Sequence, residues 1–320
     1  MKSINKYLAA TLASLGLAAG AAATDFPKNE VRLVVNYGAG GNTDVASRAL
    51  AKGMEKPLGK PVIVENKPGA LGTIGPGYVA RQAPDGYTVG VVTYSTQAIM
   101  PHLMKLPYTM DDFDFVAGVG RYRYGITVRA DSPYKTLQDL VEAAKKPNGM
   151  FFGAPSSPNN LALLELGRLT GGKFEQVSYK SGSETVTALL GGQVDVIVQN
   201  PSDVLPHIRD GKLRMIASAS PMRWPELPEV PTIQESGWPV QIDSWIGLAT
   251  PRGAPADVLA KLQQAALAAV ADPDPVTRDS FEKLGVDPAS LKGSEYAELL
   301  KQGHEEMGRM IRDANLPRIN

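Results

Sequence analysis

Small donor residues recur in this sequence where an apolar run gives way to a helical pattern. The first such junction follows Val31–Val35 and reads Gly-Ala-Gly-Gly at 38–41, then Asn-Thr-Asp at 42–44. Glycine lets the backbone approach a bound molecule closely, and Asn, Thr and Asp are all competent first residues of a helix. Because the free N–H groups at a helix start favour negative charge, this junction predicts an anion-binding loop.

Three further junctions carry the same kinds of residue. A second glycine loop spans 66–77, residues 155–160 read Pro-Ser-Ser-Pro-Asn-Asn, and residues 180–183 read Lys-Ser-Gly-Ser. Any one of them can be an ordinary turn or helix cap without a ligand. Four together favour a cleft lined by neutral donors, which can hold a carboxylate and leaves no unpaired cation buried when it is empty.

The residues that nucleophilic or metal chemistry needs are scattered. His102, His207 and His304 stand in unrelated local contexts, and the sequence has neither cysteine nor the Gly-x-Ser-x-Gly pattern of a hydrolase. The first glycine loop is similar to a dinucleotide-binding fingerprint with Glu65 as the ribose-binding acid, but Thr43 stands where the last glycine belongs. We therefore predict no catalytic residue, no metal site and no cofactor, and keep the dinucleotide interpretation as a minor alternative.

Charge and the N-terminal residues restrict the class of protein further. Lys and Arg number 33 and Asp and Glu number 33, so the formal net charge is zero, which argues against a nucleic-acid partner. Residues 1–23 are typical of a signal peptide: Lys2 and Lys6 precede an apolar stretch at 7–17 and a run of small residues that ends at Ala23, where we predict cleavage. A membrane anchor is the alternative, but the apolar stretch is shorter than the roughly 20 residues that span a bilayer.

The four junctions lie within a repeated alternation of strand and helix patterns. In the first third of the chain we predict strands at 31–35, 61–65 and 87–93, with helices from residue 42 and at 78–82. In the middle we predict strands at 126–128, 151–154, 174–179, 194–198 and 213–217, with helices at 136–145, 161–169 and 184–190. This alternation is typical of α/β proteins with parallel sheets, in which ligands bind beyond the carboxyl ends of the strands.

The last third of the chain should return to the first lobe. It contains a Pro-rich connection at 221–239, an apolar segment at 245–249, and helical patterns at 257–271 and from Ser294. We therefore predict a signal peptide at 1–23, a first lobe at 24–122, a second lobe at 123–220, and a return to the first lobe at 221–320. A chain that crosses twice between lobes gives a hinge and a cleft.

Motifs along nearly the whole chain match a known family. They are residues 31–35 with 38–41 and Asp44, 64–69, 83–88, 106–108 with 112–113, 179–182, 190–195, 205–208 with 211–214, 227–232, and 245–249 with Pro251. In these motifs the chain resembles the periplasmic substrate-binding receptors of tripartite tricarboxylate transporters, the Bug or TctC-like family. The resemblance implies a two-lobed periplasmic binding protein of the type II, Venus flytrap class, each lobe a mainly parallel sheet flanked by helices.

The resemblance also implies a function. Such a receptor is a periplasmic monomer that closes on a small organic carboxylate and delivers it to the membrane permease subunits of a tripartite tricarboxylate transporter. The expected ligand-binding residues are Tyr37, Gly38, Ala39, Gly40, Gly41, Asn42, Thr43, Ala70, Gly72, Thr73, Ser95, Ala154, Ser156, Ser157, Asn159, Tyr179, Ser181, Gly182, Gln199 and Asn200. A ligand-sensing accessory protein for a two-component sensor kinase and an exported α/β enzyme are the alternatives.

Two departures from the family pattern bear on the ligand. Asn36 and Tyr37 stand where the family usually has Pro-Phe, and Gln199 and Asn200 stand where members that take amino acids tend to carry an acidic residue. Because an ammonium group buried without a negative partner is costly, we predict a non-amino carboxylate, above all a di- or tricarboxylate. A flat slot for an aromatic acid such as terephthalate is also open, lined by Tyr37, Tyr94, Tyr122, Tyr124 and Tyr179.

Overall fold

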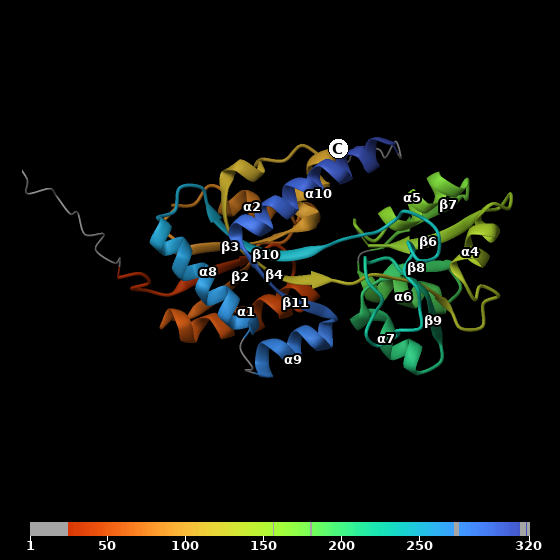
Figure 1. The fold of residues 1–320 in the computed structure, drawn as a ribbon, viewed down its shortest axis with the longest axis horizontal. Helices are drawn as coiled ribbons and strands as arrows, with labels where there is room; N and C mark the ends of the chain where they lie inside the picture. The colour runs from red at the N-terminus through yellow and green to blue at the C-terminus, as the bar shows by residue number, and fades with distance from the viewer. Residues whose placement is uncertain (1–24, 156, 180, 272–274, 314–317, 319–320) are drawn as a thin grey trace, which may run out of the picture.

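Two lobes, each built around its own β-sheet, make up the structure (Figure 1). The computed structural model describes residues 25–155, 157–179, 181–271, 275–313 and 318. The predicted signal peptide at 1–23 lies outside these residues. Within the described part of the chain, no helix combines the length and the apolar character needed to cross a membrane.

The first lobe holds a six-stranded sheet in the order β11-β4-β10-β3-β1-β2. Its strands are β1 (Val31–Val35), β2 (Val62–Asn66), β3 (Thr88–Thr93), β4 (Phe113–Tyr122), β10 (Trp245–Pro251) and β11 (Val286–Lys292). Its helices are α1 (Asn42–Leu58), α2 (Ile74–Val79), α3 (Met100–Leu103), α8 (Ala256–Ala271), α9 (Pro275–Leu284) and α10 (Gly293–Asp313), with the short turns η1 (Ala70–Gly72), η2 (Ser95–Ile99) and η3 (Met110–Asp112).

The second lobe holds a five-stranded sheet in the order β7-β6-β8-β5-β9. Its strands are β5 (Gly125–Arg129), β6 (Met150–Ala154), β7 (Phe174–Ser178), β8 (Val196–Gln199) and β9 (Leu213–Ser218). Its helices are α4 (Leu137–Ala144), α5 (Leu161–Thr170), α6 (Gly182–Leu190) and α7 (Pro201–Arg209). The predicted two-lobed α/β architecture is therefore confirmed.

Both sheets are mixed, which corrects the prediction that each is mainly parallel. β1 pairs in parallel with β2 and β3, and β6 with β7 and β8. β10 pairs antiparallel with β3 and β4, β11 with β4, and β5 with β8 and β9. The antiparallel strands include those next to the crossings between lobes, because a chain that leaves a lobe and comes back must run past itself in the opposite direction. The parallel units are the ones that carry the four predicted junctions.

The lobes are joined by two segments, and one of them crosses later than predicted. The first crossing lies between Tyr122, where β4 ends, and Gly125, where β5 begins. The return to the first lobe was expected from residue 221, but the side chain of Trp224 is fully buried in the core of the second lobe. Thr232 also bridges to Ser218 at the end of β9. The Pro-rich segment thus belongs to the second lobe, since Trp224 buries its large apolar surface there, and the chain crosses only just before β10.

The predicted C-terminal helices are present as α8 and α10, but two elements between them were not predicted. α9 and β11 lie there, and β11 is an edge strand that pairs with β4 through a register shift. Pro288 lies inside β11, and proline is usually confined to edge strands because it has no N–H to donate. A strand of this kind gives little alternation of polar and apolar residues to recognise in a sequence.

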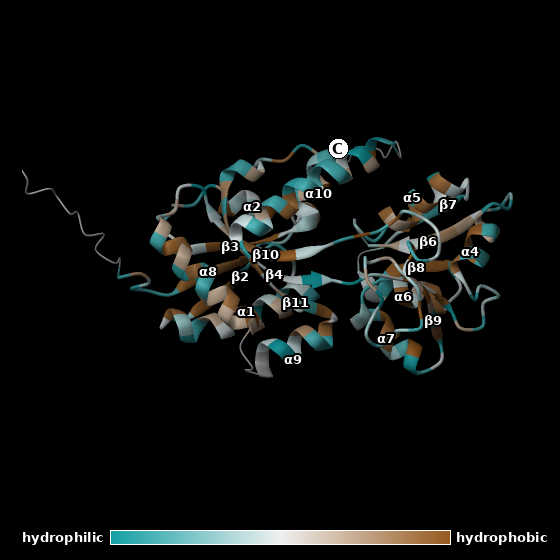
Figure 2. Ribbon diagram, in the orientation of Figure 1, coloured by the Kyte–Doolittle hydropathy of each residue, from teal (hydrophilic) through white to brown (hydrophobic). Residues whose placement is uncertain are grey.

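Apolar packing fixes the direction of α1, whose first turn faces the second lobe. The predicted apolar positions Ala46, Leu50 and Met54 are all buried. Gly53 lets α8 approach closely, since a Cβ at that position would lie 2.8 Å from the Cβ of Ala269. Apolar residues follow the sheets and the inner faces of the helices, whereas the outer face of α10 is hydrophilic (Figure 2). The helix is therefore held along its length, and its N-terminus is presented to the space between the lobes.

Candidate functional site

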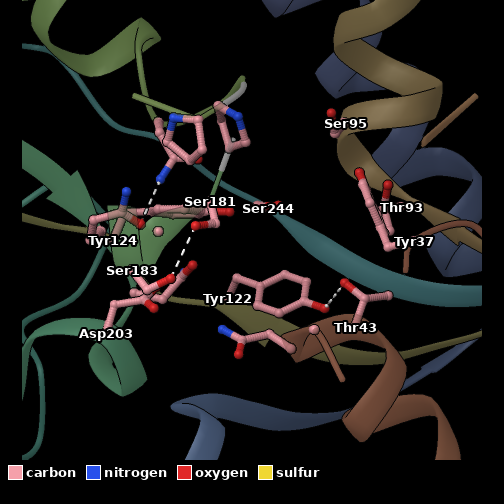
Figure 3. A pocket seen from close by; sticks show the side chains of 18 of the residues that line it. Tyr37, Thr43, Thr93, Ser95, Tyr122, Tyr124, Ser181, Ser183, Asp203 and Ser244 are labelled. Atoms are coloured by element: carbon pink, nitrogen blue, oxygen red, sulfur yellow. Dashed lines mark hydrogen bonds between the residues drawn. The ribbon is translucent and has the colours of Figure 1, made fainter. Parts of the chain in front are cut away.

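A cleft of about 540 Å³ lies between the lobes, beyond the carboxyl ends of β1, β3, β6 and β8 (Figure 3). Residues of both lobes and of the crossing segments line it. They are Tyr37, Ala39, Gly40, Gly41, Asn42, Thr43, Thr93, Ser95, Tyr122, Tyr124, Pro155, Ser157, Pro158, Asn159, Ser181, Gly182, Ser183, Gln199, Asn200, Asp203 and Ser244.

The start of α1 offers backbone donors to this cleft. Gly40 has a φ of +81°, which favours glycine, and Gly41 is the extended residue just before the helix. The first helical hydrogen bond runs from the N–H of Val45 to the carbonyl of Gly41 (2.9 Å). The N–H groups of Asn42 and Thr43 precede that bond and have no acceptor within the helix. A bound anion would meet them at the positive end of the helix dipole.

Asp44 holds the first glycine loop in place. Its buried carboxylate accepts hydrogen bonds from the N–H of Gly40 (2.8 Å), the side-chain amide of Asn66 (2.7 Å) and the guanidinium of Arg48 (3.0 Å). The same Asn66 amide donates to the carbonyl of Tyr37 (2.9 Å). Burial alone would raise the pKa of Asp44, but the hydrogen bonds together lower it. The loop is thereby tied to β2 in a fixed shape.

The second glycine loop packs against Tyr37, and its predicted binding residues Ala70, Gly72 and Thr73 are not among the residues that line the cleft. Gly72 has a φ of +89°, and a Cβ there would lie 2.8 Å from the ring of Tyr37. Its carbonyl accepts a hydrogen bond from the side chain of Asn36 (3.2 Å). Glycine is needed at position 72 because the backbone comes close to the side chain of Tyr37.

Phenol and hydroxyl groups form the first-lobe wall of the cleft. Burial raises the pKa of Tyr37, although hydrogen bonds with Thr93 and Ser95 act in the opposite direction. The hydroxyls of Tyr122 and Thr43 lie 2.8 Å apart, and burial raises the pKa of Tyr122 as well. Both phenols therefore keep their protons at physiological pH and can donate hydrogen bonds. Figure 3 shows Tyr37, Thr93 and Ser95 across the cleft from Ser183 and Asp203.

The start of α6 is the corresponding donor of the second lobe. The Ser181 hydroxyl caps the helix by accepting a hydrogen bond from the N–H of Glu184 (3.2 Å), and it lies 3.0 Å from the Ser183 hydroxyl. The first helical bond runs from the N–H of Thr185 to the carbonyl of Ser181 (3.3 Å). The N–H groups of Gly182 and Ser183 precede it, so this helix start also has donors without an intrahelical acceptor.

Gln199 lies in the cleft wall, but its amide is already paired. Its Nε2 donates to the Thr185 hydroxyl (2.6 Å), and its Oε1 accepts from Asn159 Nδ2 (3.2 Å). Asn200 is similarly engaged, because its Nδ2 donates to the carbonyl of Arg123 (2.7 Å). Tyr124 hydrogen-bonds with Asn200 and Ser244, while burial, the larger effect, raises its pKa to about 12. These groups shape the wall and leave little freedom to turn toward a guest.

The predicted ligand-binding residues divide into three groups. At the cleft are Tyr37, Ala39, Gly40, Gly41, Asn42, Thr43, Ser95, Ser157, Asn159, Ser181, Gly182, Gln199 and Asn200. Away from its lining are Gly38, Ala70, Gly72, Thr73, Ala154 and Tyr179, of which Ala154 is fully buried at the end of β6. Ser156 lies outside the described residues.

The proposed aromatic slot is only partly assembled. Tyr37, Tyr122 and Tyr124 line the cleft. The ring of Tyr94 instead lies against Gly303 of α10, and Tyr179 lines a separate shallow depression on the second lobe. The remaining rings come from different elements and carry hydroxyls that are hydrogen-bonded within the wall.

Asp203 lines the cleft, although the sequence motifs did not predict it there. Among the described lining residues it is the only one with a formal charge. The expectation of a cleft without an acidic group, based on Gln199 and Asn200, is therefore wrong. Asp203 is the third residue of α7, and the turn of the helix brings it back toward the cleft, a placement that follows from the helix start at Pro201.

Hydrogen bonds join the lobes across the cleft. The side-chain amide of Asn42 donates to the Ser202 hydroxyl (3.0 Å), which connects the starts of α1 and α7. The Ser95 hydroxyl donates to the carbonyl of Ser157 (3.2 Å). The structure therefore has the two donor-bearing walls facing each other at a distance that a small molecule can bridge.

Apart from Asp203, the described residues that line the cleft are uncharged. Among the described lining residues there is no histidine, lysine or arginine. His102 and His304 pack against each other between α3 and α10, with ring centroids 4.1 Å apart, away from the cleft lining. In the described part of the chain, no three His, Cys, Asp or Glu residues are grouped so that they could hold a metal ion. Main-chain N–H groups and neutral hydroxyls from both lobes are suited to a small polar anion.

A family model and the similar proteins all point to one family. Residues 46–316 match the family model described as tripartite tricarboxylate transporter family receptor. The UPF0065 protein in the gbd 5' region of Cupriavidus necator is 37% identical over 304 residues, which cover 91% of this chain and 90% of that protein.

Solved structures of similar proteins contain carboxylates. MatC from Rhodopseudomonas palustris, solved with bound malate, has a TM-score of 0.77 at 30% identity, over 89% of this chain and 100% of MatC. An R. palustris protein solved with adipate has a TM-score of 0.81 at 26% identity, over 92% of this chain and 100% of that one. These structures share the two-lobed fold described above.

Proposed function

Because the chain belongs to the receptor family of tripartite tricarboxylate transporters, we propose that it is a solute receptor whose cleft closes on a small organic carboxylate. The observation that carries this proposal is the pair of helix starts, α1 and α6, whose N–H groups face one cleft from opposite lobes. A carboxylate held there would replace its water shell with main-chain donors and hydroxyls, and no lysine or arginine would be needed.

The finer features of the proposal rest on the family and on the sequence. The malate and adipate bound to two similar proteins support a di- or tricarboxylate, and Tyr37, Tyr122 and Tyr124 leave an aromatic acid such as terephthalate open. The receptor would be exported to the periplasm, lose its signal peptide near Ala23, act as a monomer, and deliver its ligand to the permease subunits of a tripartite tricarboxylate transporter.

A thermal-shift screen of the purified protein tests the function. The panel should contain aliphatic and aromatic mono-, di- and tricarboxylates together with amino acids. A ligand at 100 times its Kd adds about 2.7 kcal/mol to the free energy of unfolding, which raises the melting temperature measurably. If no carboxylate of any kind shifts the melting temperature, the proposed function is wrong.

A pair of variants at one position tests the place of the carboxylate. Asn42→Pro removes a main-chain N–H at the first position of α1, where proline is well tolerated and where the preceding Gly41 is already extended. Asn42→Ala removes the side chain and its bond to Ser202 but keeps the N–H, so it is the matched control. We expect the proline variant to bind the ligand about 10-fold more weakly than the alanine variant, since a hydrogen bond to a charged group is lost. Equal affinities would place the carboxylate elsewhere.

A further inference from the structure

An uncommon helical turn carries Ser95 into the cleft. The turn η2 is a π-helix that leads directly into α3, and π-helical turns are rare and frequent at functional sites. Its first residue, Ser95, lines the cleft, and the Ser95 hydroxyl donates to the carbonyl of Ser157 in the second lobe (3.2 Å). The shape of η2 therefore sets the position of the donor in this bond between the lobes.

The C-terminal helix α10 grips η2 from outside, at two positions that lack a side chain. The ring of Tyr94, the residue before η2, lies against Gly303. The ring of His102, in α3, lies against Gly308, where a Cβ would be 2.6 Å from His102 Cε1. A side chain at either glycine would collide with these rings, so α10 packs directly on both ends of the segment 94–102.

Two histidine rings make the contacts between these ends. His304 Nδ1 lies 3.3 Å from the carbonyl oxygen of Gln97, and His102 Nε2 lies 2.8 Å from the carbonyl oxygen of His304. A carbonyl oxygen only accepts hydrogen bonds, so each of these ring nitrogens carries a proton. Pro101, four residues after Gln97, has no N–H for the Gln97 carbonyl in the ordinary helical pattern, and the His304 ring supplies a donor to it.

The two rings are close enough for their charges to interact. Their centroids lie 4.1 Å apart, so protonation of both would bring two positive charges together. Burial, the neighbouring His304 and the guanidinium groups of Arg312 and Arg318 lower the pKa of His102, although its bond to the His304 carbonyl acts in the opposite direction. Besides His102, residues 95–103 carry no titratable side chain. The other charged residues of these elements and their ends are Glu305, Glu306, Arg309 and Asp313 of α10, and Lys105 just after α3.

The neutral pair thus holds η2 in place, and a doubly charged pair cannot hold it in the same way. We propose that His102 and His304 form a pH-sensitive clamp on the cleft wall. With neutral rings, α10 fixes η2, and the Ser95 hydroxyl reaches the second lobe. With protonated rings, the charges push α10 and α3 apart, and the longer contact, from His304 to the Gln97 carbonyl, opens. Acid therefore frees η2 and weakens the bond between the lobes; the consequence for ligand affinity rests on the proposed function.

NMR titration of the unliganded protein tests the clamp. The chain has three histidines, so their ring signals can be assigned by replacing each in turn. All proteins compared should carry Asp203→Asn, because burial raises the pKa of this cleft carboxyl to about 6, within the range of the titration. From about pH 8 to about pH 5, where histidines gain their protons, we expect the backbone amide signal of Ser95 to shift with the same midpoint as the rings of His102 and His304.

Histidine variants show whether the shift comes from the clamp. His304→Gln keeps a side chain that can donate to the Gln97 carbonyl but cannot take up a proton in this range, so the Ser95 signal should stay constant. His207→Gln removes the third histidine, in α7 of the second lobe, and should keep the full shift. His102→Gln is the second test if His304→Gln folds poorly. A shift of the Ser95 signal that persists in both clamp variants would overturn the proposal.

Calorimetry connects the clamp with binding. Malate and adipate, the acids bound by two similar proteins, are the first probes, followed by the other acids of the thermal-shift panel. Between about pH 7.5 and about pH 5.5, we expect the affinity to fall about 2- to 10-fold more with His304 present than in His304→Gln, the effect of one neutral hydrogen bond. The comparison cancels protonation of the acids themselves.

The outcomes separate the clamp from the receptor function. Equal falls in affinity for the two proteins would overturn the link between the clamp and the cleft, and the receptor function would stand. If no acid of the panel binds while the Ser95 signal follows the histidine rings, the receptor function fails and the clamp stands.

Discussion

Single residues decide the polarity of the cleft. Neutral donors come from the loops at 38–43 and 181–183, and the formal charge among the described lining residues is that of Asp203. Asp44, although it is the acidic residue of the first motif, faces inward and serves the loop. The two acidic side chains differ in their surroundings. The carboxylate of Asp44 accepts hydrogen bonds from three residues, whereas that of Asp203 lines the cleft.

Asp203 should make the stability of the unliganded protein depend on pH. Burial raises its pKa from 3.8 to about 6, so the folded protein binds this proton more tightly than the unfolded chain does. The stabilisation from the bound proton is complete below about pH 4 and is lost as the pH rises through about 6. We therefore expect Asp203→Asn to be more stable than wild type above about pH 7 and to lose this advantage by about pH 4.

Urea denaturation of both proteins across this pH range measures the effect. Asp210→Asn is the control, because Asp210 is exposed and lies outside the cleft lining. Its free energy of unfolding should differ from that of wild type by a nearly constant amount throughout. Parallel curves for wild type and Asp203→Asn would show that the Asp203 carboxylate is not desolvated in the folded protein.

Residue patterns predicted much of the neutral lining of the cleft and did not predict its charged residue. Glycines and serines at the junctions are recognisable because helix starts need them, and thirteen of the predicted residues lie at the cleft. Asp203 carries no such signal, since an acid in the first turn of a helix is ordinary on a surface. Gln199 shows the converse: its position was predicted, but its amide is paired with Thr185 and Asn159, and pairing of this kind is visible only in three dimensions.

At the scale of loops and helices, the two glycine loops of the first lobe have different tasks. The first forms the start of α1, and the second supports the ring of Tyr37 from behind. Glycine permits close approach in both cases, so the sequence does not distinguish a loop that cradles a ligand from one that cradles a tyrosine. Many of the strands and helices of both lobes were predicted, but β4, α7 and β11 were not. β11 is an edge strand with an internal proline, and its pattern is weak.

Gly72→Ala tests the supporting role of the second loop. Alanine at a φ of +89° is strained, and its Cβ would meet the Tyr37 ring at 2.8 Å. We expect a loss of about 1–3 kcal/mol in the free energy of unfolding together with weaker ligand binding, because Tyr37 must move. Gly59→Ala is the control, since Gly59 has a φ of +70° but open space around its Cβ. It should lower stability and leave ligand affinity unchanged; equal loss of affinity in both variants would contradict the model of Tyr37 support.

The first crossing segment is held by a buried arginine. Arg123 forms ion pairs with Glu226 of the second lobe (2.6 Å) and Asp287 of the first (3.1 Å), and only 4% of its side chain is exposed. Arg123→Met would remove the cation that pairs with both carboxylates and leave them to repel each other, with Arg121 and Arg209 as the remaining positive charges that act on them. We expect the free energy of unfolding to fall by about 2–4 kcal/mol. The largest losses reported for breaking a fully buried ion pair should not be reached, because both acids keep some contact with water.

Denaturation measurements can separate this pair from an ordinary surface one. Arg252 pairs with Asp114 (3.3 Å) with 68% of its side chain exposed. Arg252→Met should therefore lower the free energy of unfolding by less than about 1 kcal/mol. If Arg123→Met and Arg252→Met lower the free energy of unfolding by similar amounts, Arg123 does not stabilise the crossing segment more than a surface ion pair would.

For the molecule as a whole, the proposed function makes ligand binding and closure of the lobes one equilibrium. Each lobe has its own sheet, and two crossing segments, a cleft and direct hydrogen bonds lie between the lobes. A ligand that touches both lobes favours the closed form by the difference between its affinities for closed and open protein. Direct hydrogen bonds such as Asn42 to Ser202 and Ser95 to Ser157 add to the stability of the closed form.

Ser202→Ala isolates one of these contacts, because Ser202 is not among the residues that line the cleft. Loss of its bond to Asn42 should weaken the closed form and hence the apparent ligand affinity by about 2- to 10-fold, the effect of one neutral hydrogen bond. The free energy of unfolding of the unliganded protein should change less, since an open form has no such bond to lose. Small-angle scattering should show the radius of gyration falling as ligand is added, with more ligand needed for the variant. If the radius of gyration stays constant while calorimetry shows that the protein is saturated with ligand, the lobes do not move on binding. The affinity would then have to be explained by a preformed cleft alone.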